Sequence, residues 1–364
     1  MADTLDQFIR TIKVFYEQKL NMLQGGKQGI DQLLFGVDDM DESANFAIDS
    51  LVRNPYAISF RKRGEQSHVR PYTAGTGNIY EVPRASEKTP ITEYLRDSVV
   101  AGIESTSGWV THNGRLIKQI VDEHVAAHTV TRWKLAIDTI RTGSFTPLGI
   151  GGEDIGEEID FSRDATCEVT YDFTAAGSTI DFALKEMYDA MRANGAGISN
   201  LCVILGARWQ QELEIDSDVL EKMQANTANQ VISLNMMPPE LNNTQDLYVI
   251  GRYRPSGVVA PIWILAYVPT QKYVAYNGAT AAEFMPEDEA IMFGLGDQRY
   301  RVFRGVDALS DNGMVTRAVG EIVFDSYTEK DPISEFVRSQ TRIAMVPGNV
   351  NHTVRSSGQF EQES

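Results

Sequence analysis

Two histidines and a neighbouring glutamate are the residues of this chain whose spacing could support metal chemistry. His124 and His128 lie four residues apart in a segment with helical patterning, and Glu123 precedes the first of them. Imidazoles at that spacing share one helix face and can bind zinc together. The zinc-hydrolase order, however, needs Glu directly after the first His, where this chain has Val125. A metal-dependent enzyme using His124 and His128 is therefore the alternative interpretation, and two solvent-facing histidines fit so loose a match better.

The other candidate motifs predict structure rather than catalysis. The acidic cluster Asp38–Glu42 has no glycine at the sixth position of a calcium loop, so it is interpreted as a solvated turn. The glycines near residues 75–77 and 149–152 lack the Lys-Ser/Thr ending of a phosphate-binding loop and are interpreted as turns. No nucleophile-elbow motif frames a serine. The sequence predicts no catalytic residue, no cofactor and no metal.

Composition limits the class of protein further. The chain has 364 residues, a formal net charge of −17 and 2 cysteines. Cys167 and Cys202 are expected to be buried thiols in a reducing compartment, with a disulfide between them as the open alternative. An acidic balance argues against a protein that grips nucleic acid. No apolar run is long enough to span a membrane, and the first residues lack the features of a signal peptide.

A long two-stranded ribbon is predicted over residues 56–82. Tyr56, Ile58 and Phe60 alternate with smaller or polar residues, which is the pattern of a strand with two unlike faces. A turn then precedes a returning strand at residues 66–72. A hairpin alone in water is marginally stable, and the neighbouring sequence offers it no partner. We therefore expect this ribbon to pack on a neighbouring copy of the protein.

One long helix, called the spine helix here, is predicted from about Gly114 to Thr142, where Gly143 ends it. Its apolar stripe changes side midway, so the two ends are expected to contact different partners. The first face carries Leu116, Ile117, Ile120 and Val121, and the nearly opposite one carries Val130, Trp133, Ile137 and Ile140.

The remaining segments are assigned by periodicity and turn signals. Residues 4–23 are predicted to be an amphipathic helix within an N-terminal arm, although an ordinary first helix of a globular domain is the alternative. A helix is predicted to start at Thr89-Pro90, and residues 144–177 are expected to form short strands and loops. A compact α/β region follows. Its expected elements are helices after Thr179, at 207–213 and at 219–224, strands at 201–205, 247–254, 261–268 and within 287–309, then strands at 319–324 and 342–346 and a polar tail from Asn349.

Three of these segments together resemble a known family. They are the helix–strand unit 178–209, the strand pair 247–269 and residues 286–309. In this order they are similar to the lambda capsid protein E family, the major capsid proteins of tailed bacteriophages with the Hong Kong 97 type of fold. The resemblance covers roughly residues 45–350 and rests on the ensemble of segments rather than on one motif.

The resemblance implies an α+β fold with the parts of a phage capsid subunit. Residues 1–55 would be the N-terminal arm and 56–85 the extended loop. Residues 86–177 would form the peripheral domain with the spine helix at about 114–142, and 178–309 the axial domain. Residues 310–364 would return to the peripheral domain and end in a C-terminal tail.

The function implied is that of a major capsid protein, with no enzymatic activity. Its copies would self-assemble into hexamers and pentamers of an icosahedral shell that encloses double-stranded DNA without sequence-specific binding. The implied partners are the protein itself, a scaffolding protein, a portal and a decoration protein; the location is the virion, after assembly in the bacterial cytoplasm. Another phage structural protein, such as a scaffold or tail-tube subunit, is a further alternative. The residues expected to contact a neighbouring subunit are Tyr56, Ile58, Phe60, Arg61, Lys62, Arg63, Arg70 and Tyr72 on the loop, and the expected spine-helix contacts are Val130, Trp133, Ile137 and Ile140.

Overall fold

The computed structural model describes residues 29–49, 77–91, 106–147, 156–196, 200–216, 219, 241, 247–267, 284–295, 297, 299–309, 315–330 and 333–360. Several predicted segments lie outside these ranges: the helix at 4–23, both ribbon strands within 56–72, and the helix at 219–224 apart from Val219. Every residue predicted for the extended-loop contact also lies outside them. Those predictions stay predictions.

The spine helix α4 (Thr106–Thr142) spans 37 residues, or roughly 55 Å. It confirms the predicted helix but begins eight residues earlier, because the helix includes Gly108 and Gly114. Each glycine lowers helix propensity by about 1 kcal/mol, which is why sequence patterning placed the start later. The helix ends as predicted at Gly143, whose positive φ of 73° suits a residue without a side chain.

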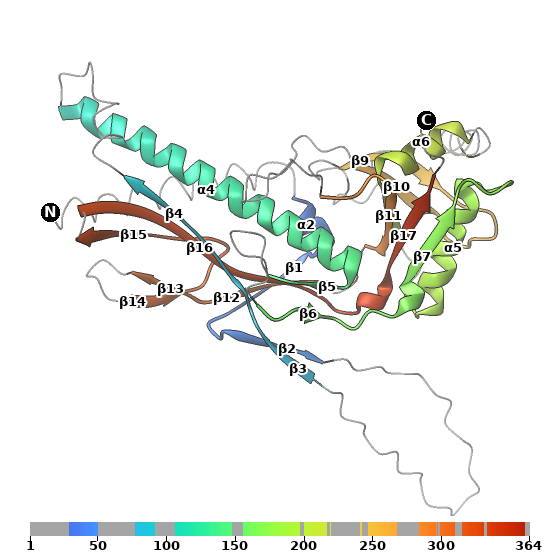
Figure 1. Cartoon of the computed structure of the whole chain (residues 1–364), viewed down its shortest axis with the longest axis horizontal. Helices are drawn as coiled ribbons and strands as arrows, with labels where there is room; N and C mark the ends of the chain where they lie inside the picture. Colours follow the sequence, from blue (N-terminus) through green and yellow to red (C-terminus); the bar gives the residue numbers. More distant parts are fainter. Residues whose placement is uncertain are drawn as a thin grey trace, which may run out of the picture.

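A five-stranded sheet, here called the long sheet, lies along α4 (Figure 1). Its central strand pairs first with two neighbours and then, further along, with a third. The central strand is β16 (Ile333–Pro347), and its neighbours are β15 (Val323–Lys330), β4 (Arg84–Ile91) and β12 (Arg299–Arg304), with β1 (Val37–Asp41) parallel to β12 at the edge.

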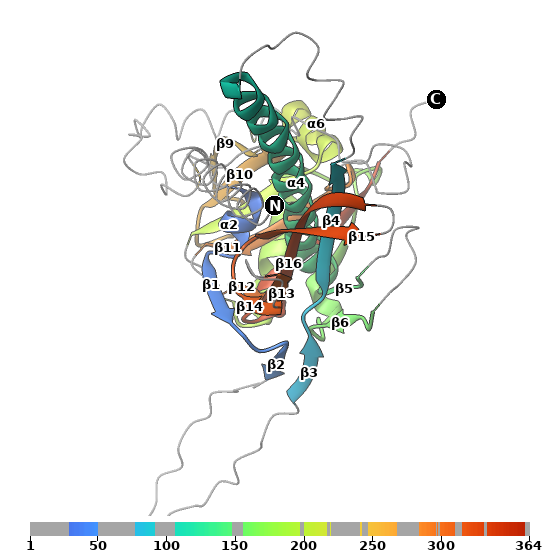
Figure 2. The same cartoon turned by 90° about the vertical axis from the view of Figure 1, so that its left-hand side faces the viewer.

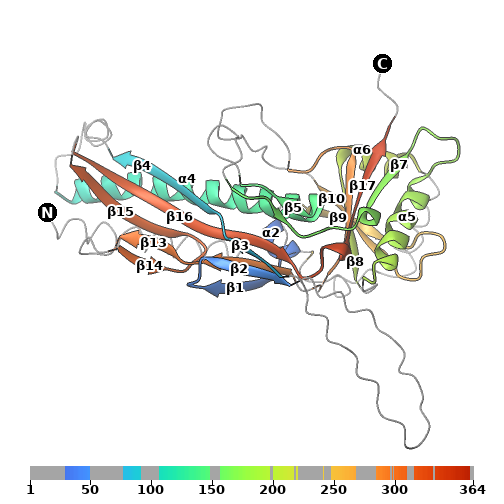
Figure 3. The same ribbon diagram turned by 60° about the horizontal axis from the view of Figure 1, so that its bottom comes forward.

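A six-stranded sheet, here called the compact sheet, stands at the C-terminal end of α4 (Figure 3). Its strand order is β7-β17-β11-β8-β10-β9. The strands are β7 (Glu168–Asp172), β8 (Leu201–Leu205), β9 (Leu247–Tyr253), β10 (Ile262–Tyr267), β11 (Glu289–Gly294) and β17 (Thr353–Gln359).

Both faces of the compact sheet are covered. On one face, α5 (Ile180–Ala193) and α6 (Ala207–Ile215) enclose a core that includes Met187 and Trp209. On the other, α4 and the short helix α2 (Ile30–Leu34) enclose a second core that includes Trp133. All five residues of β8 are buried, which confirms the prediction of a strand covered on both faces.

The remaining described elements are small. Two short helical turns are η1 (Ala165–Cys167) and η3 (Val350–His352). Three two-stranded ladders are formed by β2 (Asn45–Asp49) with β3 (Gly77–Glu81), β5 (Ser144–Phe145) with β6 (Ile159–Asp160), and β13 (Val306–Leu309) with β14 (Val315–Ala318). Figure 2 shows β2 and β3 projecting from the body on the side away from α4.

Four local predictions are wrong. The strand predicted at 319–324 begins only at Val323, and residues 319–322 lie between strands β14 and β15. Thr89-Pro90 lies within strand β4, where eight registered pairs with β16 override the local helix-start signal; Pro90 is tolerated because β4 is an edge strand among the described elements. The acidic cluster is strand β1, not a turn. The polar tail contains β17, a strand inserted between β7 and β11. Neither β1 nor β17 carries an apolar alternation, so only pairing with distant strands identifies them.

The other predictions for the compact region are confirmed in the described residues. The helix after Thr179, the helix from Ala207 and the two strands joined near Gly257 all form. Cys167 and Cys202 are free and buried, so the disulfide alternative is excluded.

Candidate functional site: the spine helix and the hairpin base

The C-terminal half of α4, residues 130–142, is held by apolar packing. Trp133, Ile137 and Ile140 are buried and Val130 is partly buried against the same core, so all four predicted contact residues pack within their own chain. The indole of Trp133 meets Phe284 edge-on at 6.2 Å between ring centroids. Since burial of one such side chain contributes about 1.5–3 kcal/mol, this half of the helix is firmly fixed.

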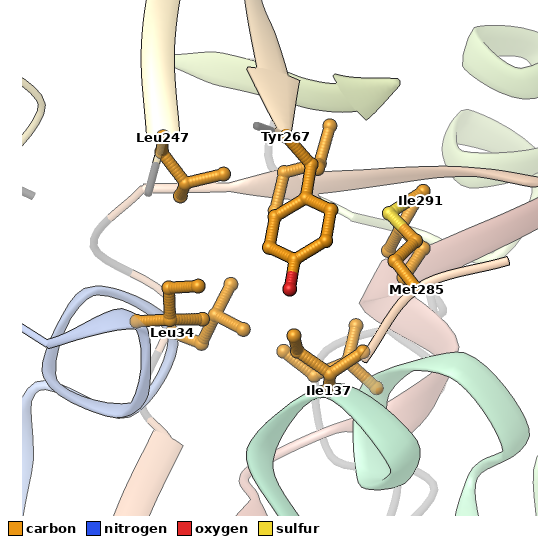
Figure 4. A pocket seen from close by; sticks show the side chains of 9 residues that line it. Leu34, Ile137, Leu247, Tyr267, Met285 and Ile291 are labelled. Carbon is orange, nitrogen blue, oxygen red and sulfur yellow. The ribbon is translucent and has the colours of Figure 1, made fainter. Parts of the chain in front are cut away.

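Figure 4 shows how side chains converge at this point from α2, α4 and the compact sheet. Leu34, Ile137, Leu247, Met285 and Ile291 close around an enclosed space of about 10 Å³. That is no more than one water molecule could occupy, and the lining is apolar except for the hydroxyl of Tyr267, which points into the space (Figure 4). The helix therefore joins the two sheets through a well-filled core rather than through a ligand pocket.

The half of α4 before residue 130 contacts the long sheet through side-chain hydrogen bonds of two histidines. Nε2 of His124 forms a hydrogen bond with Oγ1 of Thr89 on β4 (2.8 Å), and Nε2 of His128 forms one with Oγ of Ser339 on β16 (2.9 Å). Both imidazoles are almost fully buried, so the prediction of solvent-facing histidines is wrong. The helical spacing was read correctly, but the sheet that covers the histidines comes from residues far away in the sequence.

Burial lowers the pKa of both histidines. The pKa of His124 lies below its ordinary value, mainly through desolvation, with the Glu123 carboxylate opposing the shift. The pKa of His128 falls to about 4, because burial is reinforced by the charges of His124 and Arg132. Within the described residues, no three His, Cys, Asp or Glu side chains are placed to hold a metal ion.

Arg132 marks the boundary between the two halves of α4. Its guanidinium donates to Oε2 of Glu321 (2.7 Å) and lies 3.9 Å from Oδ2 of Asp31, a buried carboxylate of α2. Arg301 on β12 donates to the same Asp31 oxygen (2.9 Å) and, through Nε, to Asp38 on β1 (2.7 Å). Nothing in the sequence pattern predicts this network, because its members are separated by up to 290 residues.

The C-terminal end of α4 is fastened to the compact sheet by guanidinium groups. Arg163 donates to the carbonyl oxygens of Ile140 (2.9 Å) and Arg141 (2.6 Å), and also to that of Thr353 at the start of β17 (2.9 Å). These bonds satisfy carbonyls that the end of a helix leaves free. Nearby, Nε of Arg141 lies 3.0 Å from the buried carboxylate of Glu289 on β11. These contacts hold the C-terminal end of α4 in a fixed position against the compact sheet.

The β2–β3 ladder is attached to the body by one of its two faces. Phe46 and Tyr80 pack in a core with Val82 and Phe161, and their rings lie 6.1 Å apart. Ile79 points to the other face and is 72% exposed. This ladder is the base of the hairpin whose two predicted strands lie outside the described residues.

The fold and the surface together define a class of protein. A long helix laid on an extended sheet, a compact α/β part at one end and a projecting hairpin describe a Hong Kong 97 type capsid subunit. Among the described residues, Ile215 and Ile79 are the most exposed large apolar side chains, and exposed apolar surface is typical of contacts between proteins. No described helix combines the length and apolar character that crossing a bilayer requires.

Comparison with known proteins gives the family. The family described as phage major capsid protein E matches residues 17–357, and this chain belongs to it. The protein is accordingly a structural component of the virion whose copies form the capsid shell, and it is not an enzyme. The metal-dependent alternative receives no support from the family, and the resemblance read from the sequence is confirmed.

One solved structure supports the fold, and others are more distantly similar. A crystal structure assigned as a prophage capsid protein of E. coli CFT073 has a TM-score of 0.60 at 14% identity, over 92% of this chain and 94% of that one. The mature capsid of bacteriophage PhiM1 scores 0.42 at 13% identity, over 90% of this chain and 85% of that one. The capsid of Ralstonia phage GP4 scores 0.44 at 9% identity, over 93% and 88%. No curated protein sequence matches this chain.

Proposed function

We propose that copies of this chain associate into hexamers and pentamers, which close an icosahedral shell around double-stranded DNA. In this proposal the long sheet and the outer part of α4 form the peripheral domain, and most of the compact sheet forms the axial domain. Rings of this kind use contacts between unlike surfaces that close by rotation. A net charge of −17 supports a shell that holds DNA without binding its phosphates tightly.

The observation that carries the proposal is the one-sided attachment of the β2–β3 ladder. Phe46 and Tyr80 fasten one face, whereas Ile79 is 72% exposed on the other. A two-stranded ribbon needs more buried surface than this to be stable. A neighbouring copy that covers Ile79 would supply it, with the extended loop of residues 56–85 continuing over that neighbour.

The assembly partners follow from the same proposal. A scaffolding protein would direct the curvature of the growing shell, a portal would occupy one vertex, and a decoration protein would bind the outside. Assembly would take place in the cytoplasm of the bacterial host. Co-expression with each candidate, followed by sedimentation of the particles, tests which of them remain bound.

The direct test is the substitution Ile79→Asp. A carboxylate on the outer face of the ladder should prevent the neighbour from covering it, so shells and capsomers should be absent from negative-stain images and sedimentation profiles. Ile79→Val is the matched control, because it keeps an apolar β-branched side chain, and it should assemble. Far-UV circular dichroism checks that both subunits fold. Normal shells from a well-folded Ile79→Asp protein would contradict the proposed contact.

A further inference from the structure

Two buried imidazoles fasten the outer half of α4, residues 118–129, to two different strands. His124 is bound to Thr89 of β4 and His128 to Ser339 of β16, at 2.8 and 2.9 Å. Their side chains are 1% and 4% exposed. The ring of His124 also stacks on Phe324 of β15, 6.3 Å away between centroids. The polar attachment of this half to the long sheet therefore passes through groups that can take up a proton.

The charged groups that face the two imidazoles are few. From α4 itself these are Glu123 and Arg132, and from β4 there is Glu87, whose pKa is raised by burial and by the Glu123 carboxylate. On β15 and β16 the facing side chains that the structure describes are uncharged, namely Phe324, Ser326, Ser339 and Thr341. Glu335 and Lys330 follow at the same alternation further along these strands, and their side chains lie outside the described part. The ion pair of Asp325 and Arg338 belongs to the alternate positions of these strands, on the opposite face of the sheet.

Neither histidine has a counter-charge in direct contact. Among the described residues, neither imidazole forms an ion pair with a carboxylate at an N···O distance of 4.0 Å or less. The interface also contains buried polar atoms without hydrogen-bond partners: Nδ1 of His124, Oγ of Ser326 and Oγ1 of Thr341. A proton added here would place a charge where burial penalises it, and at His124 the carboxylate of Glu123 offsets only part of that penalty.

We propose that His124 and His128 form a proton-operated latch, which holds the outer half of the spine helix on the long sheet when neutral and releases it when protonated. The release is local, because within residues 133–142 the side chains of Trp133, Ile137 and Ile140 are buried in an apolar core. The latch belongs to the single subunit and is independent of how subunits are arranged in a shell.

The direction of the pH effect follows from linkage. A histidine whose pKa is lowered in the closed state stabilises that state fully above its ordinary pKa of about 6.5, and the stabilisation is lost as the pH falls toward the lowered value. For His128 the window runs from 6.5 down to about 4. If only the protonation of His128 is considered, the fraction of molecules in which residues 118–129 have left the long sheet should rise roughly 20-fold between pH 7 and pH 5. Glu87 acts in the opposite sense, since a raised carboxyl pKa favours the closed state as the pH falls.

Hydrogen exchange followed by mass spectrometry on the full-length subunit tests the latch. After correction for the intrinsic exchange rate, residues 118–129 should open at least 10-fold more often at pH 5 than at pH 7, while residues 133–142 change less than 2-fold. His128→Gln retains a hydrogen-bonding side chain that cannot be protonated, so it should remove most of the difference. His352→Gln, at a partly exposed histidine outside this interface, should leave the difference intact.

Two outcomes would overturn the proposal. One is a wild-type protein whose outer half opens equally at both pH values, or opens together with residues 133–142; this result does not depend on any variant folding. The other is a folded His128→Gln protein that keeps the full pH dependence. Glu87→Gln supplies an independent check, because removing the opposing carboxyl should make the wild-type dependence steeper.

Discussion

The two halves of α4 share one continuous backbone but are held in different ways. The inner half buries Trp133, Ile137 and Ile140 in a core built from α2 and both sheets. The outer half buries Ile120, Val121 and Val125 beside two histidines, and meets hydroxyl groups of the long sheet. The inner half has the larger apolar core together with an ion pair to the compact sheet, whereas the hydrogen bonds that attach the outer half to the long sheet come from two histidines and change with protonation.

The energetic difference between the halves decides which of them can move. A hydrogen bond contributes about 1 kcal/mol net, because the same groups bond to water when exposed. Full burial of a large apolar side chain contributes about 1.5–3 kcal/mol. A helix with both kinds of attachment should therefore open from its polar end first, as local unfolding does in weakly packed regions.

The largest expected effect comes from the inner half. Trp133→Ala removes a buried indole and its edge-on contact with Phe284, so the free energy of unfolding should fall by about 3–5 kcal/mol. Urea denaturation followed by circular dichroism measures this loss. Gln119→Ala, on the exposed surface of the outer half, should change stability by no more than about 0.5 kcal/mol. Similar losses for the two variants would contradict the comparison.

The boundary between the halves should be almost as sensitive. Asp31→Ala removes one carboxylate from the buried guanidinium of Arg301, which keeps Asp38 and the more distant Glu321, and it leaves Arg132 with Glu321. We expect a loss of about 3 kcal/mol in unfolding free energy, at the lower end of the cost of breaking a buried ion pair. Asp41→Ala, an exposed carboxylate of β1, is the matched control and should be close to neutral. If both substitutions cost the same, the network is not what fixes α2 and β1.

Two glycines of similar backbone conformation can be compared: Gly143 follows the end of α4, and Gly195 follows the end of α5. Gly143 has a φ of 73° and an added Cβ would lie 2.6 Å from Cβ of Arg163, whereas Gly195 has a φ of 78° with nothing within 4 Å. Gly195→Ala should cost about 1 kcal/mol from backbone strain alone. Gly143→Ala should cost more, about 2–3 kcal/mol, because Arg163 must move away from the helix carbonyls it caps. Thermal unfolding of the pair checks this order, and equal costs would remove the special role of the Arg163 contact.

The smallest effect is expected in the outer half. Ser339→Ala removes the hydroxyl that pairs with Nε2 of His128, at a cost of about 1–2 kcal/mol at pH 7. Thr316→Ala, on an exposed strand, is the control and should be within about 0.5 kcal/mol of wild type. A loss at Ser339 equal to that at Trp133 would mean that the two halves are held equally strongly.

Local patterning was sufficient for the compact part of the fold. The helix after Thr179 carries a clear apolar stripe, and residues 201–205 form a continuous apolar run, so both could be predicted from neighbouring residues alone. The spine helix was likewise recognised by its period and by Gly143. The change of apolar face along it correctly indicated that its two halves contact different elements.

Patterning failed where pairing partners are distant. Strand β17 contains the fully buried Ser356, and three of the five residues of strand β1 are aspartates, so neither strand has the apolar alternation expected of a strand. The Thr89-Pro90 signal for a helix start is genuine locally, but registered pairing with β16 outweighs it. The buried positions of His124 and His128 were missed for the same reason, since the residues that cover them are up to 211 positions away.

The sequence by itself determined the spine helix, the principal helices and strands of the compact part and, through its resemblance to a known family, that copies of the chain form a capsid shell. The tertiary structure alone decided which polar residues are buried, because burial depends on what the rest of the chain places over them. It also decided that one half of the spine helix is held by apolar packing and the other by two titratable side chains. Apolar periodicity is encoded over one or two turns of helix, whereas a hydrogen bond between His128 and Ser339 exists only once two distant segments have met.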